Sequence, residues 1–360
     1  MYGHVKVWKW ISIIIFSNFN QDLNCYGGAI LYNRTEIILE AYPYEFTDIQ
    51  KGRGAYICID SAGEKKILKE FSGSEAKADL LDLFLQYLKG QGIVAEQIVH
   101  TKEGHALFTD IDEARYYMRT WRDGRECDVR NRDDVLCAVR KLAKFHCVSA
   151  GFTDQMPDPL CKTDDSLKLQ YERHMKELRK VRNYIKSRKK KNEFEARFLK
   201  EYSYYYDQAK EAIGGGLENG FQQRKERYFG VCHGDFNQHN LLFTPQGAVI
   251  INYERFCKDA YVSDCAHFFR KILEKHNWNA GIGMDMVNAY DKVRRLEGWE
   301  MGQLYLRMAF PEKFWKVANH YFNSKKSWAN NRDSEKLEKI CAQEQERSEF
   351  LKLLKNFVKE

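Results

Sequence analysis

A cluster of polar residues separates two apolar segments in "VCHGDFNQHNLLF", residues 231–243. Asp235 follows an apolar run, so its carboxylate would stand at a turn, where it can accept a proton from an attacking hydroxyl. Asn240 lies five residues later and offers a side-chain carbonyl that suits a hard cation such as Mg²⁺. A polar turn in which Asp235 and Asn240 cap backbone groups fits the same residues equally well.

The next apolar segment, "AVIIN", would bring a further metal ligand beside this loop. It ends in Asn252, and Glu254 follows two residues later. The pattern His-Gly-Asp, four residues, then Asn has the spacing of a phosphotransferase catalytic loop, in which the Asp positions the nucleophile and the Asn binds metal. Asn252 stands where a carboxylate is expected, and an amide brings one oxygen and no charge to Mg²⁺. Glu254 could substitute in part if its strand lets it reach the metal.

Three residues elsewhere fit the same chemistry. Lys69 closes "KKILK", where a lysine can reach phosphate groups, and Glu75 begins the next helix, where it could pair with Lys69. Asp264, in "SDCAHF", could support the loop by accepting its backbone N–H groups. Plainer alternatives are an exposed strand position for Lys69 and a helix N-terminal charge for Glu75. The order of these residues along the chain is what favours a kinase-like fold.

Residues 35–120 have the pattern of a small sheet that carries one helix. "EIILEAY" predicts a helix, "KGRGAYICID" a strand entered through glycines, and "KKILKEF" an alternating strand. "SEAKADLLDLFLQYLKGQG" predicts a helix with Ser74 as N-cap and Gly90 or Gly92 as its stop. "ALFTDIDEARYYMRTW" predicts two strands separated by a turn.

Residues 121–360 are expected to form a larger, mainly helical lobe that contains the loop 233–240. "DDVLCAVRKLAKFHCVS" has apolar residues at a helical period, and residues 167–191 and 193–213 predict a helical hairpin. The basic run 186–191 reads as a solvated helix end, since no aromatic residues or nucleic-acid motif accompany it. Aromatic residues of this lobe could line an acceptor or partner site, or pack in the core: Trp278, Trp299, Trp315, Trp328, Tyr202, Tyr204, Tyr205 and Tyr206.

Composition sets further bounds. The 360 residues are 44% hydrophobic, which indicates a globular chain, and the net charge of +7 does not by itself argue for nucleic acid. The ten cysteines occur without a Cys-x-x-Cys pair, which favours reduced intracellular thiols over zinc or disulfides. Residues 1–34 include an apolar run too short to span a bilayer and are read as an extension. The alternatives are a secretion signal and a membrane anchor at residues 7–16.

The chain resembles the aminoglycoside/choline-kinase-type phosphotransferase superfamily and, within it, the CotS-type spore coat proteins. The resemblance is carried by "QKGRGAYICIDSAGEKKILKEFSGSEAKADLL", "MRTWRDGRECDVRN", "LAKFH", "HGDFNQHNLLF" and "INYERFCKDAYVSDCAHFFRKILEK". It implies a two-lobed α+β fold of the protein-kinase type, with a small antiparallel N-terminal sheet and a helical C-terminal lobe.

The resemblance also implies roles for particular residues. It assigns Asp235 as catalytic base, Asn240, Asn252 and Glu254 to the metal, and His233 and Asp264 to support of the loop. The residues that it implies for binding nucleotide are Gly52, Gly54, Lys69, Glu75, Met118 and Thr120, with residues 118–121 as the hinge beside the adenine. ATP and Mg²⁺ are the expected cofactors if the protein is active, and none is expected otherwise.

Two functions remain open at this point. One is a CotS-like coat or coat-assembly protein, made in the mother-cell cytoplasm, recruited by other spore coat proteins and catalytically impaired by Asn252. The other is an active ATP-dependent phosphotransferase that acts on a hydroxyl of a small molecule or a protein. Neither nucleic acid nor a membrane is an expected partner.

Overall fold

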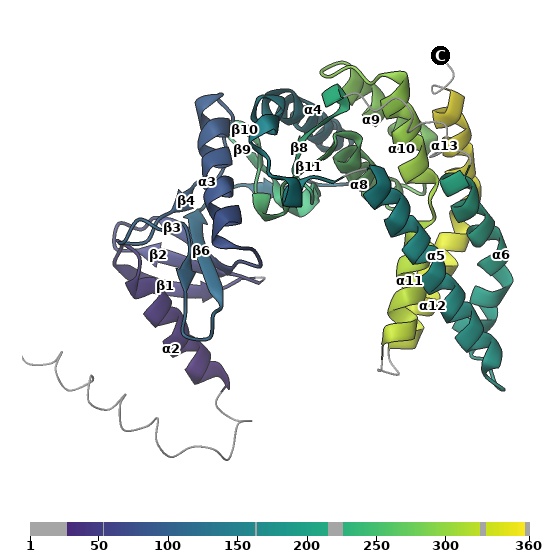
Figure 1. The fold of residues 1–360 in the computed structure, drawn as a ribbon, viewed down its shortest axis with the longest axis horizontal. Coiled ribbons are helices and arrows are strands. Elements are labelled where there is room, and N and C mark those ends of the chain that lie inside the picture. Colours follow the sequence, from purple (N-terminus) through teal and green to yellow (C-terminus); the bar gives the residue numbers. More distant parts are fainter. Residues whose placement is uncertain (1–26, 53, 163, 215–225, 325–328, 357–360) are drawn as a thin grey trace, which may run out of the picture. The chain divides into compact units, whose positions relative to one another are not determined.

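The structure is a computed structural model that describes residues 27–52, 54–162, 164–214, 226–324 and 329–356. It is an α+β protein whose chain divides into two compact units (Figure 1). The first unit holds the described residues up to Asp79 together with Gln97–Trp121, and the second holds Leu80–Glu96 together with the described residues from Arg122. The limits 35–120 and 121–360 stay predictions of the domain organisation.

The first unit is built on a six-stranded antiparallel sheet in the order β1-β2-β3-β6-β4. The strand β5 pairs with the beginning of β6, at Arg115 and Tyr116. Its strands are β1 (Phe46–Lys51), β2 (Tyr56–Asp60), β3 (Lys65–Glu70), β4 (Ile98–Val99), β5 (Phe108–Thr109) and β6 (Arg115–Thr120). The helix α2 (Gly27–Glu40) begins inside the segment read as an extension. Its end packs Ile38 and Leu39 against Leu68 and Met118 of the sheet, which forms the apolar core of this unit.

The helix α3 (Glu75–Gly90) passes from the first unit into the second. Ser74 Oγ accepts the backbone N–H of Lys77 at 3.2 Å, so the predicted N-cap is confirmed. Gly92 has φ +74°, a conformation that glycine adopts without strain just beyond a helix end.

Two short ladders form the β part of the second unit. β7 (Arg125–Glu126), β9 (Leu241–Thr244) and β10 (Gly247–Ile250) form one sheet, and β8 (Phe229–Cys232) pairs with β11 (Cys257–Ala260) in the other. The loop 233–240 thus leaves β8 and enters β9 through the 3₁₀ turn η6 (Gln238–Asn240). A second turn, η7 (Tyr253–Arg255), lies between β10 and β11.

An aromatic cluster lies beside these ladders in the second unit. Phe84 of α3 stacks on Phe256 with ring centroids 5.5 Å apart, and it contacts Phe145, Phe152 and Tyr253 edge-on or tilted. All five side chains are fully buried. The later part of α3 and α4 (Arg132–Ser149) are therefore joined to the η7 turn by ring packing.

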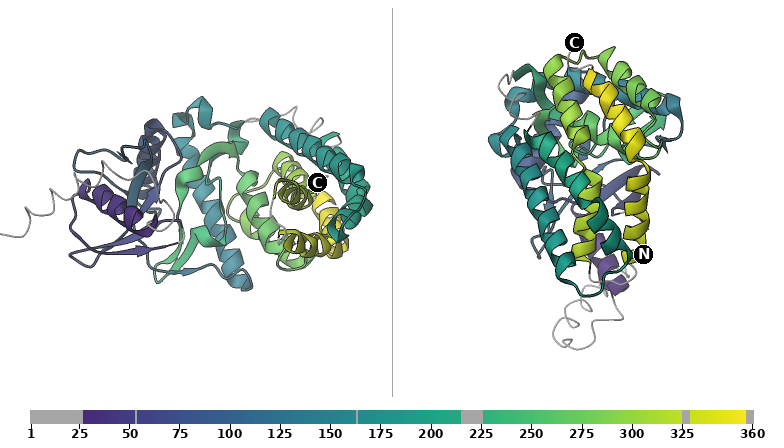
Figure 2. Two further views of the ribbon diagram at one scale, coloured as in Figure 1. Left: turned by 90° about the horizontal axis from the view of Figure 1, so that it is seen from below. Right: turned by 90° about the vertical axis from the view of Figure 1, so that its right-hand side faces the viewer.

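Helices make up the rest of the second unit. They are η2 (Ala150–Gln155), η3 (Asp158–Leu160), α5 (Asp164–Ser187), α6 (Glu193–Gly214), η5 (Glu226–Tyr228), α8 (Val262–Leu273), α9 (Ala280–Asp291), α10 (Gly298–Ala309), α11 (Glu312–Asn323), α12 (Ala329–Ala342) and α13 (Glu344–Asn356). The predicted hairpin of α5 and α6 is confirmed, and α11 and α12 pack against it (Figures 1 and 2). Phe198, Tyr205 and Phe314 stack at this junction.

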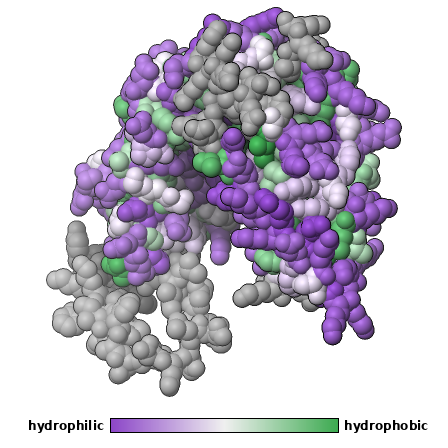
Figure 3. Space-filling view, turned by 45° about the vertical axis from the view of Figure 1, so that its right-hand side comes forward, coloured by the Kyte–Doolittle hydropathy of each residue, from purple (hydrophilic) through white to green (hydrophobic). Residues whose placement is uncertain are grey.

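Hydrophilic side chains predominate on the face drawn in Figure 3, and apolar residues stand among them singly or in small groups. Within the described residues, no helix combines the length and the apolarity that crossing a bilayer requires. The predicted anchor at residues 7–16 lies outside the described residues.

Candidate phosphoryl-transfer and nucleotide site

The turn after β8 requires glycine at position 234. Gly234 has φ +77°, and a Cβ atom built there would lie 2.0 Å from the carbonyl oxygen of Arg255. Both the conformation and the space therefore exclude a larger side chain. Because these two backbone segments approach closely, Asp235, which follows Gly234, lies next to the η7 segment.

Asp264, in the first turn of α8, holds the same turn from the other side. Its carboxylate accepts the backbone N–H groups of His233 at 2.7 Å and Gly234 at 3.0 Å. His146 Nε2 lies 3.2 Å from Asp264 Oδ2, and His146 Nδ1 accepts from the hydroxyl of Tyr290 at 2.8 Å. These bonds make His146 the Nε2–H tautomer, which donates to the carboxylate.

The electrostatics of this buried pair follow from its surroundings. Burial lowers the pKa of His146, against the hydrogen bond and charge of Asp264. Burial alone would raise the pKa of Asp264, but the hydrogen bond and charge of His146 and the N–H of His233 hold that pKa below its usual value. A neutral imidazole next to a carboxylate is the state that both directions support.

His233 is a structural member of the loop. Its Nδ1 accepts the backbone N–H of Asp235 at 3.2 Å, and its Nε2 therefore donates to the carbonyl of Ile251 at 2.9 Å. The side chain is fully buried and links the turn after β8 to the end of β10. The buried His233 therefore does not meet a substrate, whereas the Asp235 carboxylate is partly exposed.

The Asp235 carboxylate is 33% exposed and is oriented by two side chains. Asn237 Nδ2 donates to its Oδ1 at 3.1 Å, and His267 Nε2 of α8 lies 3.6 Å from the same oxygen. Burial by itself would raise the pKa of Asp235, but the His267 imidazole, the charge of Lys271 and the Asn237 amide lower it to about 2. The carboxylate is therefore ionised at neutral pH, the state that a proton acceptor needs.

Asn240 and Asn252 are hydrogen-bonded directly to each other. Asn240 Nδ2 donates to the backbone carbonyl of Asp235 at 2.8 Å, so its Oδ1 points the other way. Asn252 Nδ2 donates to that Oδ1 at 2.6 Å. Rotating either amide by 180° would bring oxygen against oxygen, so the network fixes both orientations.

Asn252 adopts a left-handed conformation with φ 65° and ψ 56°, which asparagine tolerates better than most residues. The carboxylate of Glu96 stabilises this conformation through hydrogen bonds to the backbone. Glu96, only 1% exposed, accepts the backbone N–H of Asn252 at 2.9 Å and that of Tyr253 at 3.2 Å. The backbone of the η7 segment is thus held by a buried carboxylate.

These donors do not fit Mg²⁺ as they are arranged. Oδ1 of Asn240, the oxygen that the loop spacing assigns to metal, is occupied by the Asn252 amide, and Asn252 adds no negative charge. Glu254 lies half-buried in η7, where it has interactions of its own. Among the described His, Cys, Asp and Glu residues, only the buried trio His146, Cys232 and Asp264 brings three ligand atoms within 4.8 Å of one another. Those atoms already serve hydrogen bonds, and burial raises the pKa of the Cys232 thiol.

The residues assigned to nucleotide lie in the first unit. Gly52 and Gly54 form a tight turn between β1 and β2, in which the N–H of Gly52 donates to Ala55 O at 2.8 Å and Gly54 has φ +70°. Arg53 lies outside the described residues. Lys69 is half-buried on β3, in register with Tyr117 of β6.

The segment expected as the hinge belongs to β6 in its first part. Met118 is fully buried in the core of the first unit. Thr120 Oγ1 accepts the backbone N–H of Gln97 at 3.0 Å, and its own N–H donates to Gln97 O at 2.9 Å. The assignment of residues 118–121 to a hinge beside the adenine stays a prediction.

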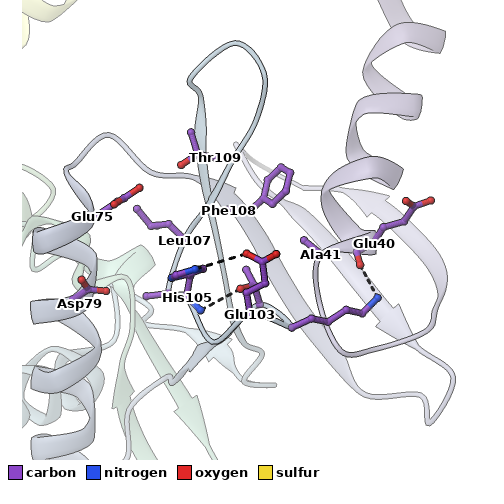
Figure 4. A pocket seen from close by; sticks show the side chains of 12 residues that line it. Glu40, Ala41, Glu75, Asp79, Glu103, His105, Leu107, Phe108 and Thr109 are labelled. Atoms are coloured by element: carbon purple, nitrogen blue, oxygen red, sulfur yellow. Dashed lines mark hydrogen bonds and ion pairs between the residues drawn. The ribbon is translucent and has the colours of Figure 1, made fainter. Parts of the chain in front are cut away.

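Glu75 faces a cavity of about 490 Å³ in the first unit (Figure 4). Asp79, Glu103 and His105 line the same cavity, and His105 Nε2 lies 3.7 Å from Glu103 Oε2. Lys102 of this segment donates to the carbonyl of Glu40 at 2.7 Å. The pairing of Glu75 with Lys69 stays a prediction.

Sequence reasoning missed several supporting residues. Lys66 is a buried lysine of β3 that pairs with Asp60, and only the alternation along "KKILKE" separates its face from that of Lys69. His267 stands three residues after Asp264 in a helix, which signals a shared face. Glu96 carries no sequence signal, because its partners are backbone groups of residues 252–253.

The fold and the loop geometry together define a class. The chain has the α+β fold of aminoglycoside phosphotransferases, as its likeness to solved structures shows. An aminoglycoside phosphotransferase from Alicyclobacillus acidocaldarius superposes with a TM-score of 0.77 at 22% identity, covering 90% of this chain and 96% of that one. An amicoumacin kinase in complex with AMP-PNP, Ca²⁺ and amicoumacin has a TM-score of 0.57 at 13% identity, covering 88% and 93%.

Within that class the chain belongs to a spore coat family. Residues 35–354 match the family described as "Spore coat putative kinase YutH". The chain is also 21% identical over 340 residues to spore coat protein S of Bacillus subtilis (strain 168), covering 89% of this chain and 94% of that protein. The expected family and fold class are confirmed.

Proposed function

We propose that this protein acts in the spore coat or in its assembly, with a kinase-type fold whose catalytic loop is not set for Mg²⁺-dependent phosphoryl transfer. The hydrogen bond from Asn252 to Asn240 carries this proposal, because it occupies the oxygen that a metal would need. Membership of a spore coat family supports the coat role. Other coat proteins are the partners that this role requires, with synthesis in the mother-cell cytoplasm and final deposition in the coat.

A deletion and complementation experiment tests the proposal. Spores of a strain that lacks the protein should have altered coat composition and reduced resistance to lysozyme. Expression of Asp235→Ala in that strain should restore the coat, since the proposed role does not use the carboxylate. Unchanged spores in the deletion strain would contradict the coat role. A folded Asp235→Ala protein that fails to restore the coat would instead favour chemistry.

A second candidate, an ATP-dependent phosphotransferase, rests on a specific observation. Asp235 is ionised, partly exposed and oriented by Asn237 and His267, as a residue that receives the proton of an acceptor hydroxyl must be. ATP and a divalent cation would be its cofactors. Transfer of labelled phosphate from ATP to coat extract, absent with Asp235→Ala, would establish this function; no transfer would exclude it for coat acceptors.

A further inference from the structure

A cavity of about 400 Å³ lies in the second unit, next to the loop that carries Asp235. Its walls come from the C-terminal end of α8, the corner between α10 and α11, and the helices α12 and α13. Gln238, three residues after Asp235, reaches it from the loop. A volume of this size suits a small molecule rather than a single ion.

The lining of this cavity has an excess of positive charge. Its seven basic residues are Arg270, Lys271, Lys275, Lys313, Lys336, Lys339 and Arg347, and its three acidic residues are Glu274, Glu312 and Glu344. Each acidic residue already has a basic partner from the same lining. These pairs are Lys313–Glu274 at 2.9 Å, Arg270–Glu312 at 2.6 Å and Arg347–Glu344 at 3.0 Å.

Four lysines of the lining do not pair with an acidic residue of the same lining, as far as the described residues show. Lys336 pairs with Asp333 at 3.3 Å, outside the cavity. Lys271, Lys275 and Lys339 form no ion pair within 4 Å in the part of the chain that the structure describes. Burial lowers the pKa of Lys271, and the charge of Asp235 opposes that shift while neighbouring cations add to it. The cations that add to it are Lys316 and Arg270, and an anion beside Lys271 would offset their repulsion.

Four of the remaining lining residues are aromatic. Trp278 is 5% exposed, and Tyr205, Phe310 and Phe314 are nearly inaccessible to solvent. Oε1 of Gln238 is buried and has no hydrogen-bond partner among the described residues, so it offers an acceptor for a ligand N–H or O–H. The lining thus combines charged side chains with aromatic ones.

The cavity lies close to the loop that carries Asp235. Lys271 follows His267 by one turn of α8, and His267 lies 3.6 Å from Asp235. A smaller cavity of about 190 Å³, lined by Gly234 and His267, shares the Arg270–Glu312 ion pair with the larger one. A ligand in the larger cavity would therefore lie beside the loop that carries Asp235.

We propose that this cavity binds a small organic anion, with a carboxylate or phosphate group on Lys271, Lys275 and Lys339 and an apolar or ring face on the aromatic wall. The proposal does not require phosphoryl transfer, so it stands apart from either function proposed above. It also excludes a polycation of the aminoglycoside type as the occupant, because the unpaired lysines would repel it.

Calorimetric titration of the full chain with a matched set of ring compounds tests this inference at 0.15 M salt. Phenyl phosphate is the anionic probe, benzyl alcohol the neutral one and benzylamine the cationic one. We expect phenyl phosphate to bind at least about tenfold more tightly than the other two, and its affinity to fall with added salt. Equal affinities, or tighter binding of benzylamine, would overturn the proposal.

Variants locate the binding. Lys275→Glu with Lys339→Glu reverses two exposed charges of the cavity and should weaken phenyl phosphate about tenfold or more. Lys189→Glu with Lys190→Glu makes the same change in net charge on the exposed hairpin turn and should leave affinity within about twofold. Equal losses in the two double variants would mean non-specific attraction and contradict a site.

A last arm separates two sources of the anionic group. A nonapeptide containing phosphotyrosine presents the same ring phosphate on a polypeptide. Binding of phenyl phosphate at least as tightly as the peptide supports a small-molecule occupant. Binding of the peptide alone would overturn it in favour of a protein segment.

Discussion

The side-chain amide of Asn252 donates a 2.6 Å hydrogen bond to Oδ1 of Asn240, the oxygen that the spacing of the loop assigns to a metal ion. In this arrangement an N–H group takes the place that a cation would otherwise occupy between two oxygens. The same hydrogen bond joins the loop to the η7 segment through two uncharged side chains, without a metal ion. Asn252 therefore changes both the charge of the site and the way in which its two asparagines are held together.

Asn252→Asp should restore a metal site. A carboxylate oxygen of the new side chain would then face Asn240 Oδ1. Mg²⁺ between the two oxygens would relieve their repulsion and would be attracted by the added negative charge. We expect Mg²⁺ to increase the affinity for ATP at least about tenfold in the variant and less than about twofold in the parent, measured by calorimetric titration with and without the cation. Asn252→Ala is the control, because it removes the hydrogen bond without adding charge. Mg²⁺-dependent ATP binding by the parent would contradict this account.

Glu96→Gln should destabilise the protein. The buried carboxylate accepts the N–H groups of Asn252 and Tyr253, and an amide accepts them without charge and turns a donor toward one of them. The expected loss in the free energy of unfolding is about 1–3 kcal/mol, measured by denaturant titration. Glu64→Gln, at an exposed turn, should change it by less than about 0.5 kcal/mol. Equal stability of the two variants would show that Glu96 does not hold the η7 backbone.

Two glycine substitutions separate backbone strain from steric overlap. Gly247→Ala, at φ +112° with open space around the Cβ position, should cost about 1–3 kcal/mol of unfolding free energy from strain alone. Gly234→Ala adds a Cβ 2.0 Å from Arg255 O and should cost at least about 3 kcal/mol, or prevent folding. Thermal unfolding of the two variants measures both losses. Similar losses would mean that the η7 backbone moves aside easily to make room for the Cβ atom at position 234.

Much of this fold was predictable because its signals are local. The period of the α4 segment, the Ser74 cap and the glycine-closed end of α3 depend on neighbours within one or two turns. The pattern His-Gly-Asp, followed five residues later by Asn240, is also local, and the positive φ of Gly234 explains why glycine stands in it.

The rest of the site depends on contacts between segments far apart in the chain. Glu96 meets Asn252 across 156 residues, and His146 meets Asp264 across 118. Composition and periodicity carry no information about such pairs. The division of α3 over the two units likewise depends on contacts between distant segments. The excess of basic residues around the 400 Å³ cavity of the second unit also arises only when distant helices are brought together.

The titration of Asp235 offers a direct test of the loop geometry. Its pKa of about 2 lies below the usual 3.8, so the carboxylate stabilises the fold above about pH 4 and this contribution is lost as pH falls through about 2. A histidine is cationic in that acid range, and His267→Ala should therefore raise the pKa of Asp235 toward its usual value. The ¹³C shift of the carboxyl carbon, followed by NMR from pH 6 downward, measures both midpoints. Lys271→Met should produce a smaller rise, because its charge contributes less than His267. A midpoint near 3.8 in the parent protein, or no change on His267→Ala, would mean that His267 does not orient this carboxylate.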